Sequence, residues 1–145
     1  MRPASLLFFV FGMAALLGCA TTARQPRMHE ASIVPSQLQP GDTALVTVKV
    51  DDAHGIVHRV EGIVADDGTI RLTLLDDGVE SDAEAGDGIW TIKVQVPFNA
   101  PPGDFHFTIY GYDNAGNRIL IFDEMNETAP LSTSFELNIT YLEQE

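Results

Sequence analysis

The 145-residue sequence has little cysteine and little positive charge, and each shortage excludes a class of protein. Its single cysteine excludes an internal disulfide framework and any zinc site built on several thiolates. Only 8 Lys and Arg residues stand against 21 Asp and Glu, for a formal net charge of -13, whereas a nucleic-acid-binding protein needs a basic face. Hydrophobic residues make up 45% of the chain, so wholesale disorder is also excluded. The length fits one domain with a short appendage.

Motifs for catalysis are missing as well. The sequence contains no Gly-x-Ser-x-Gly elbow, no His-Glu-x-x-His pair and no glycine-rich phosphate loop. His54 and His58 are four residues apart, a spacing that suits a metal site on a helix. The local pattern is strand and turn, however, in which four positions span about 13 Å. We therefore expect neither an enzyme nor a zinc site.

The longest apolar run lies at the N-terminus, where 12 uncharged residues from Leu6 to Leu17 follow Arg2. As a helix at about 1.5 Å per residue, this run covers only about 18 Å, well short of the roughly 30 Å of a bilayer core. A short apolar run behind a positive charge is typical of the central region of a signal peptide. The run therefore predicts export rather than a permanent membrane span.

The residues that follow, Leu16-Leu17-Gly18-Cys19, resemble the lipobox of bacterial lipoproteins. The resemblance implies cleavage before Cys19 and attachment of lipid, including palmitate-type acyl chains, to that residue. At about 0.8 kcal/mol per CH₂, several acyl chains make an effectively permanent membrane anchor. In Gram-negative members of the family an Asp after the cysteine retains the protein at the inner membrane, so Ala20 favours the outer membrane. The alternative is an unlipidated secretory signal that contains a cysteine.

This interpretation divides the chain into three parts. Residues 1–18 form the signal peptide, residues 19–31 form the lipidated N-terminus with a flexible tether, and residues 32–145 form the folded domain. The domain shows apolar or alternating patterns at 44–50, 55–65, 70–74, 90–96, 105–109, 119–122 and 135–141. Turn residues such as Asp66-Asp67-Gly68 separate these patterns, and none has a sustained helical period. We predict an all-β domain, an antiparallel sandwich of seven to eight strands with one shared core.

Two turn-and-strand segments carry a resemblance to bacterial immunoglobulin-like domains. Pro40-Gly41-Asp42-Thr43 leads into a Thr/Val strand, and 101–105 leads into an aromatic strand that ends at 112–117. The acidic segment from Leu75 to Thr91 is similar to the signature of choice-of-anchor X modules, which occur in secreted and surface proteins. The resemblance covers about residues 32 to 142 and implies an immunoglobulin-like β-sandwich. It departs from the pattern at 123–134, an insertion where such domains run straight through their final strand.

The acidic loop, residues 76–88, is the densest cluster of charge, with six acids in 13 residues and no Lys, Arg or His. Hard oxygen ligands at this density favour Ca²⁺. The candidate ligands are Asp76, Asp77, Asp82 and Asp87. A solvated loop with Asx-turns selects the same residues, and the spacing does not fit an EF-hand, so both interpretations stay open.

A second candidate site lies on outward positions of the predicted aromatic strand. His106, Tyr110 and Tyr112 there could form a small exposed face for a glycan or a protein. The leading hypothesis is a lipid-anchored envelope protein whose non-catalytic immunoglobulin-like domain binds another envelope protein or a surface glycan. The alternative is a calcium-dependent carbohydrate-binding or surface-adhesion module that uses the acidic loop and the tyrosine face.

Overall fold

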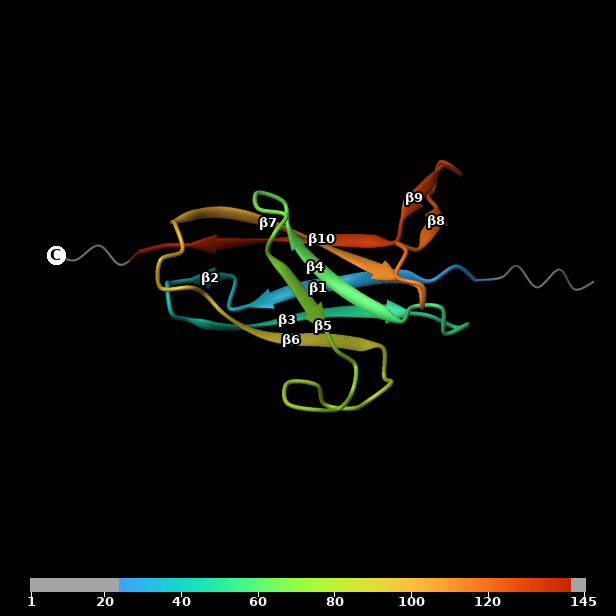
Figure 1. Cartoon of the computed structure of the whole chain (residues 1–145), viewed down its shortest axis with the longest axis horizontal. Helices are drawn as coiled ribbons and strands as arrows, with labels where there is room; N and C mark the ends of the chain where they lie inside the picture. Colours follow the sequence, from blue (N-terminus) through green and yellow to red (C-terminus); the bar gives the residue numbers. More distant parts are fainter. Residues whose placement is uncertain (1–23, 142–145) are drawn as a thin grey trace, which may run out of the picture.

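The computed structural model describes residues 24–141, and this part of the chain folds into ten strands without a helix. The all-β prediction is confirmed (Figure 1). The strands are β1 (Arg27–Val34), β2 (Gln37–Leu38), β3 (Thr43–Asp51), β4 (Arg59–Val64), β5 (Arg71–Leu74), β6 (Ile89–Gln95), β7 (Gly103–Tyr112), β8 (Leu120–Phe122), β9 (Thr128–Pro130) and β10 (Ser132–Ile139). Within 24–141, accordingly, no helix is present that is long and apolar enough to cross a membrane. The predicted signal peptide and Cys19 lie outside the described residues.

Two main sheets share one core. One has three strands in the order β1-β3-β6, and the other has five in the order β2-β10-β7-β4-β5. All neighbours are antiparallel except β2 and β10, which are parallel. Alternate residues of the strands point inward, and those of both sheets pack together. Fully buried members of this core are Leu38, Val46, Val48, Val60, Leu74 and Ile109.

Several strands meet at one end of the molecule, where β1 begins. The register places Arg27 of β1 opposite Asp51 at the end of β3, and Ser132 of β10 opposite Tyr110 near the end of β7. Strand β4 also begins at this end, since Arg59 pairs with Tyr112. We call this end of the domain the N-terminal end.

Strand β1 begins at Arg27, inside the 19–31 segment that the sequence assigned to a tether, so the assignment is wrong for residues 27–31. A break in the alternation hid this strand. Glu30 has φ 53, and the register with β3 shifts between His29 and Ser32. In addition Ile33 is the one buried residue of β1, so the pattern of buried positions is weak.

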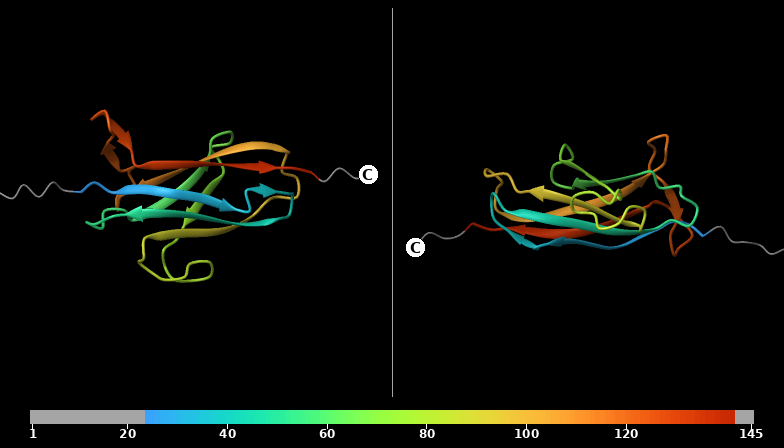
Figure 2. Two further views of the ribbon diagram at one scale, coloured as in Figure 1. Left: turned by 180° about the vertical axis from the view of Figure 1, so that it is seen from behind. Right: turned by 90° about the horizontal axis from the view of Figure 1, so that it is seen from below.

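The predicted insertion forms a hairpin of its own. Strands β8 and β9 pair as a separate two-stranded sheet, and Figures 1 and 2 show this hairpin standing out from the body at the N-terminal end. Its turn is organised by Asp123, whose Oδ1 accepts the backbone N–H groups of Met125 and Glu127, each at 2.9 Å. Asn126 completes the turn with φ 59, a conformation that Asn tolerates better than most residues.

Candidate functional site

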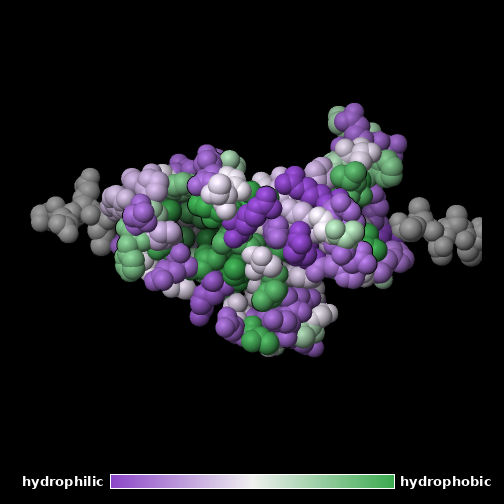
Figure 3. All heavy atoms as spheres, viewed as in Figure 1, coloured by the Kyte–Doolittle hydropathy of each residue, from purple (hydrophilic) through white to green (hydrophobic). Residues whose placement is uncertain are grey.

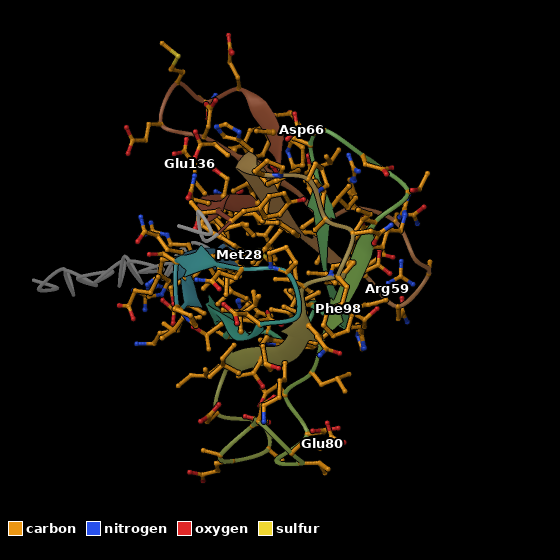
Figure 4. All side chains as sticks on the ribbon, turned by 90° about the vertical axis from the view of Figure 1, so that its left-hand side faces the viewer. Met28, Arg59, Asp66, Glu80, Phe98 and Glu136 are labelled. Carbon is orange, nitrogen blue, oxygen red and sulfur yellow. The ribbon has the colours of Figure 1, made fainter. Side chains whose placement is uncertain are left out.

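The acidic loop connects β5 to β6 and protrudes from the body, with Glu80 at its far end (Figure 4). A two-way backbone pairing closes its base, because Leu75 and Thr91 exchange N–H···O bonds of 2.9 Å in both directions. Within the described residues, the loop beyond this bridge bonds to a strand only at its end, where the carbonyl oxygen of Gly88 accepts the N–H of Val50 of β3 at 2.8 Å. The loop's own side chains must therefore organise most of it.

Aspartates supply that organisation by accepting backbone N–H groups. Asp76 binds the N–H of Gly86 through Oδ1 at 2.7 Å and that of Gly88 through Oδ2 at 3.1 Å. Asp82, which is 5% exposed, binds the N–H of Gly78 at 2.6 Å. Gly88 has φ 83, and a Cβ there would lie 2.8 Å from the carbonyl oxygen of Val50, so only glycine fits.

Three of the four predicted calcium ligands converge. Asp76, Asp82 and Asp87 each place a carboxylate oxygen within 4.8 Å of the others. Asp77 does not join them; it is exposed and accepts the N–H of Val79 in a local turn at 3.0 Å. Asp87 makes the equivalent turn with Ile89 at 2.8 Å. Within residues 24–141 no Lys, Arg or His forms an ion pair with the three converging carboxylates.

These three carboxylates fit part of a calcium site. Calcium takes about six to eight oxygen ligands, so backbone carbonyls or water would have to complete the shell. Each carboxylate oxygen has two lone pairs, and one N–H bond leaves the second free. The geometry therefore accommodates a cation, while the N–H bonds alone also account for the folded loop.

A cavity of about 550 Å³ borders two of the three converging aspartates. Asp76 and Asp87 line it together with Asp52 and the half-buried Trp90. Asp52 accepts the N–H of Val57 at 2.8 Å through Oδ2, while its buried Oδ1 has no partner among the described residues. Trp90 thus contacts the core with part of its ring and faces this cavity with the rest.

The predicted tyrosine face is not open. Tyr112 is only 5% exposed, and the guanidinium carbon of Arg59 lies 4.5 Å from its ring centroid. The guanidinium carbon of Arg118 lies 3.9 Å from the ring centroid of Tyr110. Cation–π contacts of this kind fix both arginines over the rings. Tyr112 is therefore buried and Tyr110 is half-buried beside Arg118, which corrects the prediction of exposed tyrosines.

His106 lies apart from the two tyrosines. It is four residues from Tyr110 along β7, a separation of about 13 Å in a strand, and it is exposed. Its Nε2 is 2.8 Å from Oε1 of Glu136 on β10. His106 therefore forms a pair with its cross-strand neighbour and does not share a site with Tyr110 and Tyr112.

A basic patch, which we define as Arg59, Arg71 and Arg118, gathers on the outer face of the five-stranded sheet. Arg59 Nε lies 3.0 Å from Glu61 Oε1, and Arg71 Nη1 lies 3.5 Å from Glu61 Oε2. Figure 4 places Arg59 on the side formed by β4 and β5. Three of the chain's 8 Lys and Arg residues thus share one face with Glu61, which pairs with two of them, while Glu136 on the same face pairs with His106. The sequence did not predict this patch because its arginines come from three separate segments.

The turn from 113 to 117 positions Arg118. Asp113 Oδ1 accepts the N–H groups of Ala115 and Asn117, each at 2.9 Å, and the bond from Asn117 lowers the pKa of the Asp113 carboxyl. This stabilisation is complete above the ordinary pKa of 3.8 and is lost as the pH falls through the lowered value. A hydrogen bond with Tyr112 raises the pKa of the Arg118 guanidinium, which stays a cation at any physiological pH.

No family model and no curated protein matches the chain. Three solved structures share features of its fold. The endo-β-1,4-mannanase of Thermotoga petrophila has a TM-score of 0.49 at 13% identity, over 84% of this chain and 21% of that one. The alkylpurine DNA glycosylase AlkC of Pseudomonas fluorescens has a TM-score of 0.44 at 10% identity, over 80% of this chain and 30% of that one. A Niemann-Pick type C2 protein from the Japanese carpenter ant has a TM-score of 0.41 at 15% identity, over 83% of this chain and 96% of that one.

The chain therefore spans less than a third of the first two proteins. With TM-scores below 0.5 and identities below 25%, these likenesses carry no argument about activity, ligand or partner.

Proposed function

We propose that this protein is a lipid-anchored component of the bacterial cell envelope, in which a non-catalytic all-β domain serves as an interaction or accessory module. The observation that carries this proposal is the position of Cys19. It ends an apolar signal-like run in the lipobox sequence and lies eight positions before Arg27, where β1 begins. Fully extended, that stretch reaches at most about 29 Å. A lipid on Cys19 would thus hold the N-terminal end of the domain close to a bilayer.

The strand order supports an immunoglobulin-like domain within this proposal. The first two strands contribute to different sheets, β1 beside β3 and β2 beside β10, and β7 lies between β10 and β4. Immunoglobulin-like sandwiches likewise place three or four strands against a second sheet and share one core. The acidic loop, which carries the resemblance to choice-of-anchor X modules, then occupies the connection between the two sheets.

Tethering provides the mechanism. An anchored domain searches only the membrane surface, so even a weak contact with a neighbouring envelope component gains from a high effective concentration. The basic patch is the surface that we assign to this contact. Guanidinium groups bind carboxylates and phosphates with directed hydrogen bonds, and Arg59 and Arg118 are already held in place by the tyrosine rings.

Crosslinking in intact cells tests this assignment. We expect Arg59→Gln combined with Arg118→Gln to reduce recovery of the crosslinked partner about tenfold, as the loss of about 1.4 kcal/mol of binding would. Arg24→Gln combined with Arg27→Gln removes the same charge elsewhere and is the matched control, with recovery close to that of the unaltered protein. A chelator should not change the recovery of the partner from either double variant. Equal recovery from both double variants would rule out the basic patch as the contact.

The second candidate is a calcium-dependent surface-adhesion or carbohydrate-binding module. The convergence of Asp76, Asp82 and Asp87 within 4.8 Å is the observation that favours it. Such a module would retain the cell on glycans only when calcium is present, whereas the accessory module would keep its partner in a chelator.

Thermal melting of the full-length protein tests the calcium site. If it exists, a hundredfold excess of Ca²⁺ over its dissociation constant should add about 2.7 kcal/mol of stability, which raises the midpoint by roughly 10 °C relative to EDTA. Asp87→Asn should abolish this rise. Asp77→Asn is the matched control, because Asp77 makes the same kind of turn outside the converging group. A midpoint that is the same in Ca²⁺ and EDTA would make the acidic loop purely structural.

A further inference from the structure

The β8–β9 hairpin exposes apolar side chains that the body of the domain does not cover. Leu120 is 63% exposed, Phe122 58% and Met125 81%. Figure 3 shows apolar side chains among the polar ones on this protruding element. A two-stranded hairpin is marginally stable in water on its own, so a protruding hairpin with bare apolar residues indicates a contact surface.

The N-terminal segment is attached directly to this hairpin. The side chain of Gln25 donates from Nε2 to the carbonyl oxygen of Phe122 at 3.2 Å and accepts the N–H of Phe122 through Oε1 at 2.6 Å. These two bonds join residues that are 97 positions apart and occupy the free edge of β8. Phe122 itself is only three residues from Met125 at the turn. The chain therefore enters the domain beside the tip of the hairpin.

We propose that the hairpin rests on the surface of the bilayer, with Leu120, Phe122 and Met125 in its interfacial layer. This inference depends on the proposed lipid anchor at Cys19. Six positions separate Cys19 from Gln25, which is at most about 22 Å of extended chain. The anchor would thus hold the hairpin close to the membrane.

Acidic residues in the turn set the depth and the lipid preference of this contact. One carboxylate oxygen of Asp123 accepts the N–H groups of Met125 and Glu127. Glu124 and Glu127, on either side of Met125 in the sequence, are exposed. Carboxylates are costly to place in the hydrocarbon core, and anionic headgroups repel them. The hairpin therefore lies at headgroup level and contacts zwitterionic lipid better than anionic lipid.

A fluorescent label on the full-length lipidated protein tests this inference. Met125→Cys adds a single reactive thiol, because the sulfur of Cys19 is bound to lipid, and an environment-sensitive dye can then be attached. Phe98→Cys is the matched control, since Phe98 is 82% exposed in the β6–β7 connection at the opposite end. In phosphatidylcholine–phosphatidylethanolamine vesicles we expect emission from position 125 to shift to shorter wavelength. A lipid-borne nitroxide should quench it several-fold more than position 98, and adding phosphatidylglycerol should reduce the shift.

Flotation of the same vesicles separates the possible failures. Protein that does not float with the lipid overturns the proposed anchor and the inference with it. If the protein floats but the emission and quenching at position 125 equal those at position 98, the hairpin contact is overturned and the anchor is retained. A shift at position 125 that requires an added envelope protein also overturns it, because the hairpin would then dock on protein. A larger shift in anionic vesicles would contradict the role assigned to Glu124 and Glu127.

Discussion

Exchanging residues 1–19 for a cleavable secretion signal without a lipobox is expected to move the protein from the membrane fraction to the soluble fraction. The mature chain would then begin at Ala20 and lack acyl chains, which contribute about 0.8 kcal/mol per buried CH₂. The hairpin contact alone is small and reversible, so washing should remove what remains. Fractionation followed by detection of the domain measures the result, with nearly complete transfer expected.

The unaltered protein is the reference in this experiment. Cys19→Ala alone is a poorer variant, because the uncut apolar run from Leu6 to Leu17 would itself keep the chain at the membrane. An exchanged protein that still sediments with membranes after washing would show that attachment does not depend on lipid at Cys19.

Ile109→Ala is expected to destabilise the domain by about 2 to 5 kcal/mol. Ile109 is 0% exposed, lies on the central strand β7 and belongs to the core that both sheets share. Its truncation leaves a cavity that neighbouring strands cannot fill without shifting. Since a domain of this size has a total stability of about 5 to 15 kcal/mol, the midpoint of urea unfolding should fall substantially.

Ile56→Ala provides the matched control for this prediction. Ile56 is 41% exposed in the connection between β3 and β4, outside both sheets. Its replacement should change the free energy of unfolding by no more than about 0.5 kcal/mol. Equal effects of the two variants would mean that the sheets do not share a common core around Ile109.

The strands of the core could be predicted from the sequence because their inward residues alternate. Strand β3 runs from Thr43 to Asp51 and contains the predicted 44–50. Strand β6 runs from Ile89 to Gln95, one residue earlier at each end than the predicted 90–96. Each of these strands buries one face in the core, and burial of one face makes apolar residues alternate in the sequence. Strand β1 escaped prediction because it lies at a sheet edge and is interrupted at Glu30, so backbone pairing with β3 rather than side-chain pattern defines it.

The turn of the β8–β9 hairpin repeats the pattern of residue types of the turn at 113–117. Asp123 and Asp113 organise their turns in the same way, each accepting the N–H groups two and four residues ahead. The residue in third place after each aspartate, Gly116 or Asn126, has a positive φ. The same spacing of residue types, an Asp followed in third place by Gly or Asn, therefore predicts both turns.

The candidate sites were predictable only where their residues are close in sequence. Asp76, Asp82 and Asp87 lie in one loop, so their convergence follows from local turns. Asp77 lies outside the group because its carboxylate accepts the N–H of Val79 in a separate local turn, and the sequence does not tell which way that turn faces. The basic patch and the contact of Gln25 with Phe122 join distant segments, and only strand register brings them together. The burial of Tyr112 under Arg59 is a consequence of the same register.

The most direct test of the account is the mass of the N-terminal peptide of the protein purified from a bacterial membrane. We expect this peptide to begin at Cys19 and to carry the added mass of a diacylglyceryl group and acyl chains. A peptide that begins at any other residue, or that begins at Cys19 with an unmodified thiol, would contradict it.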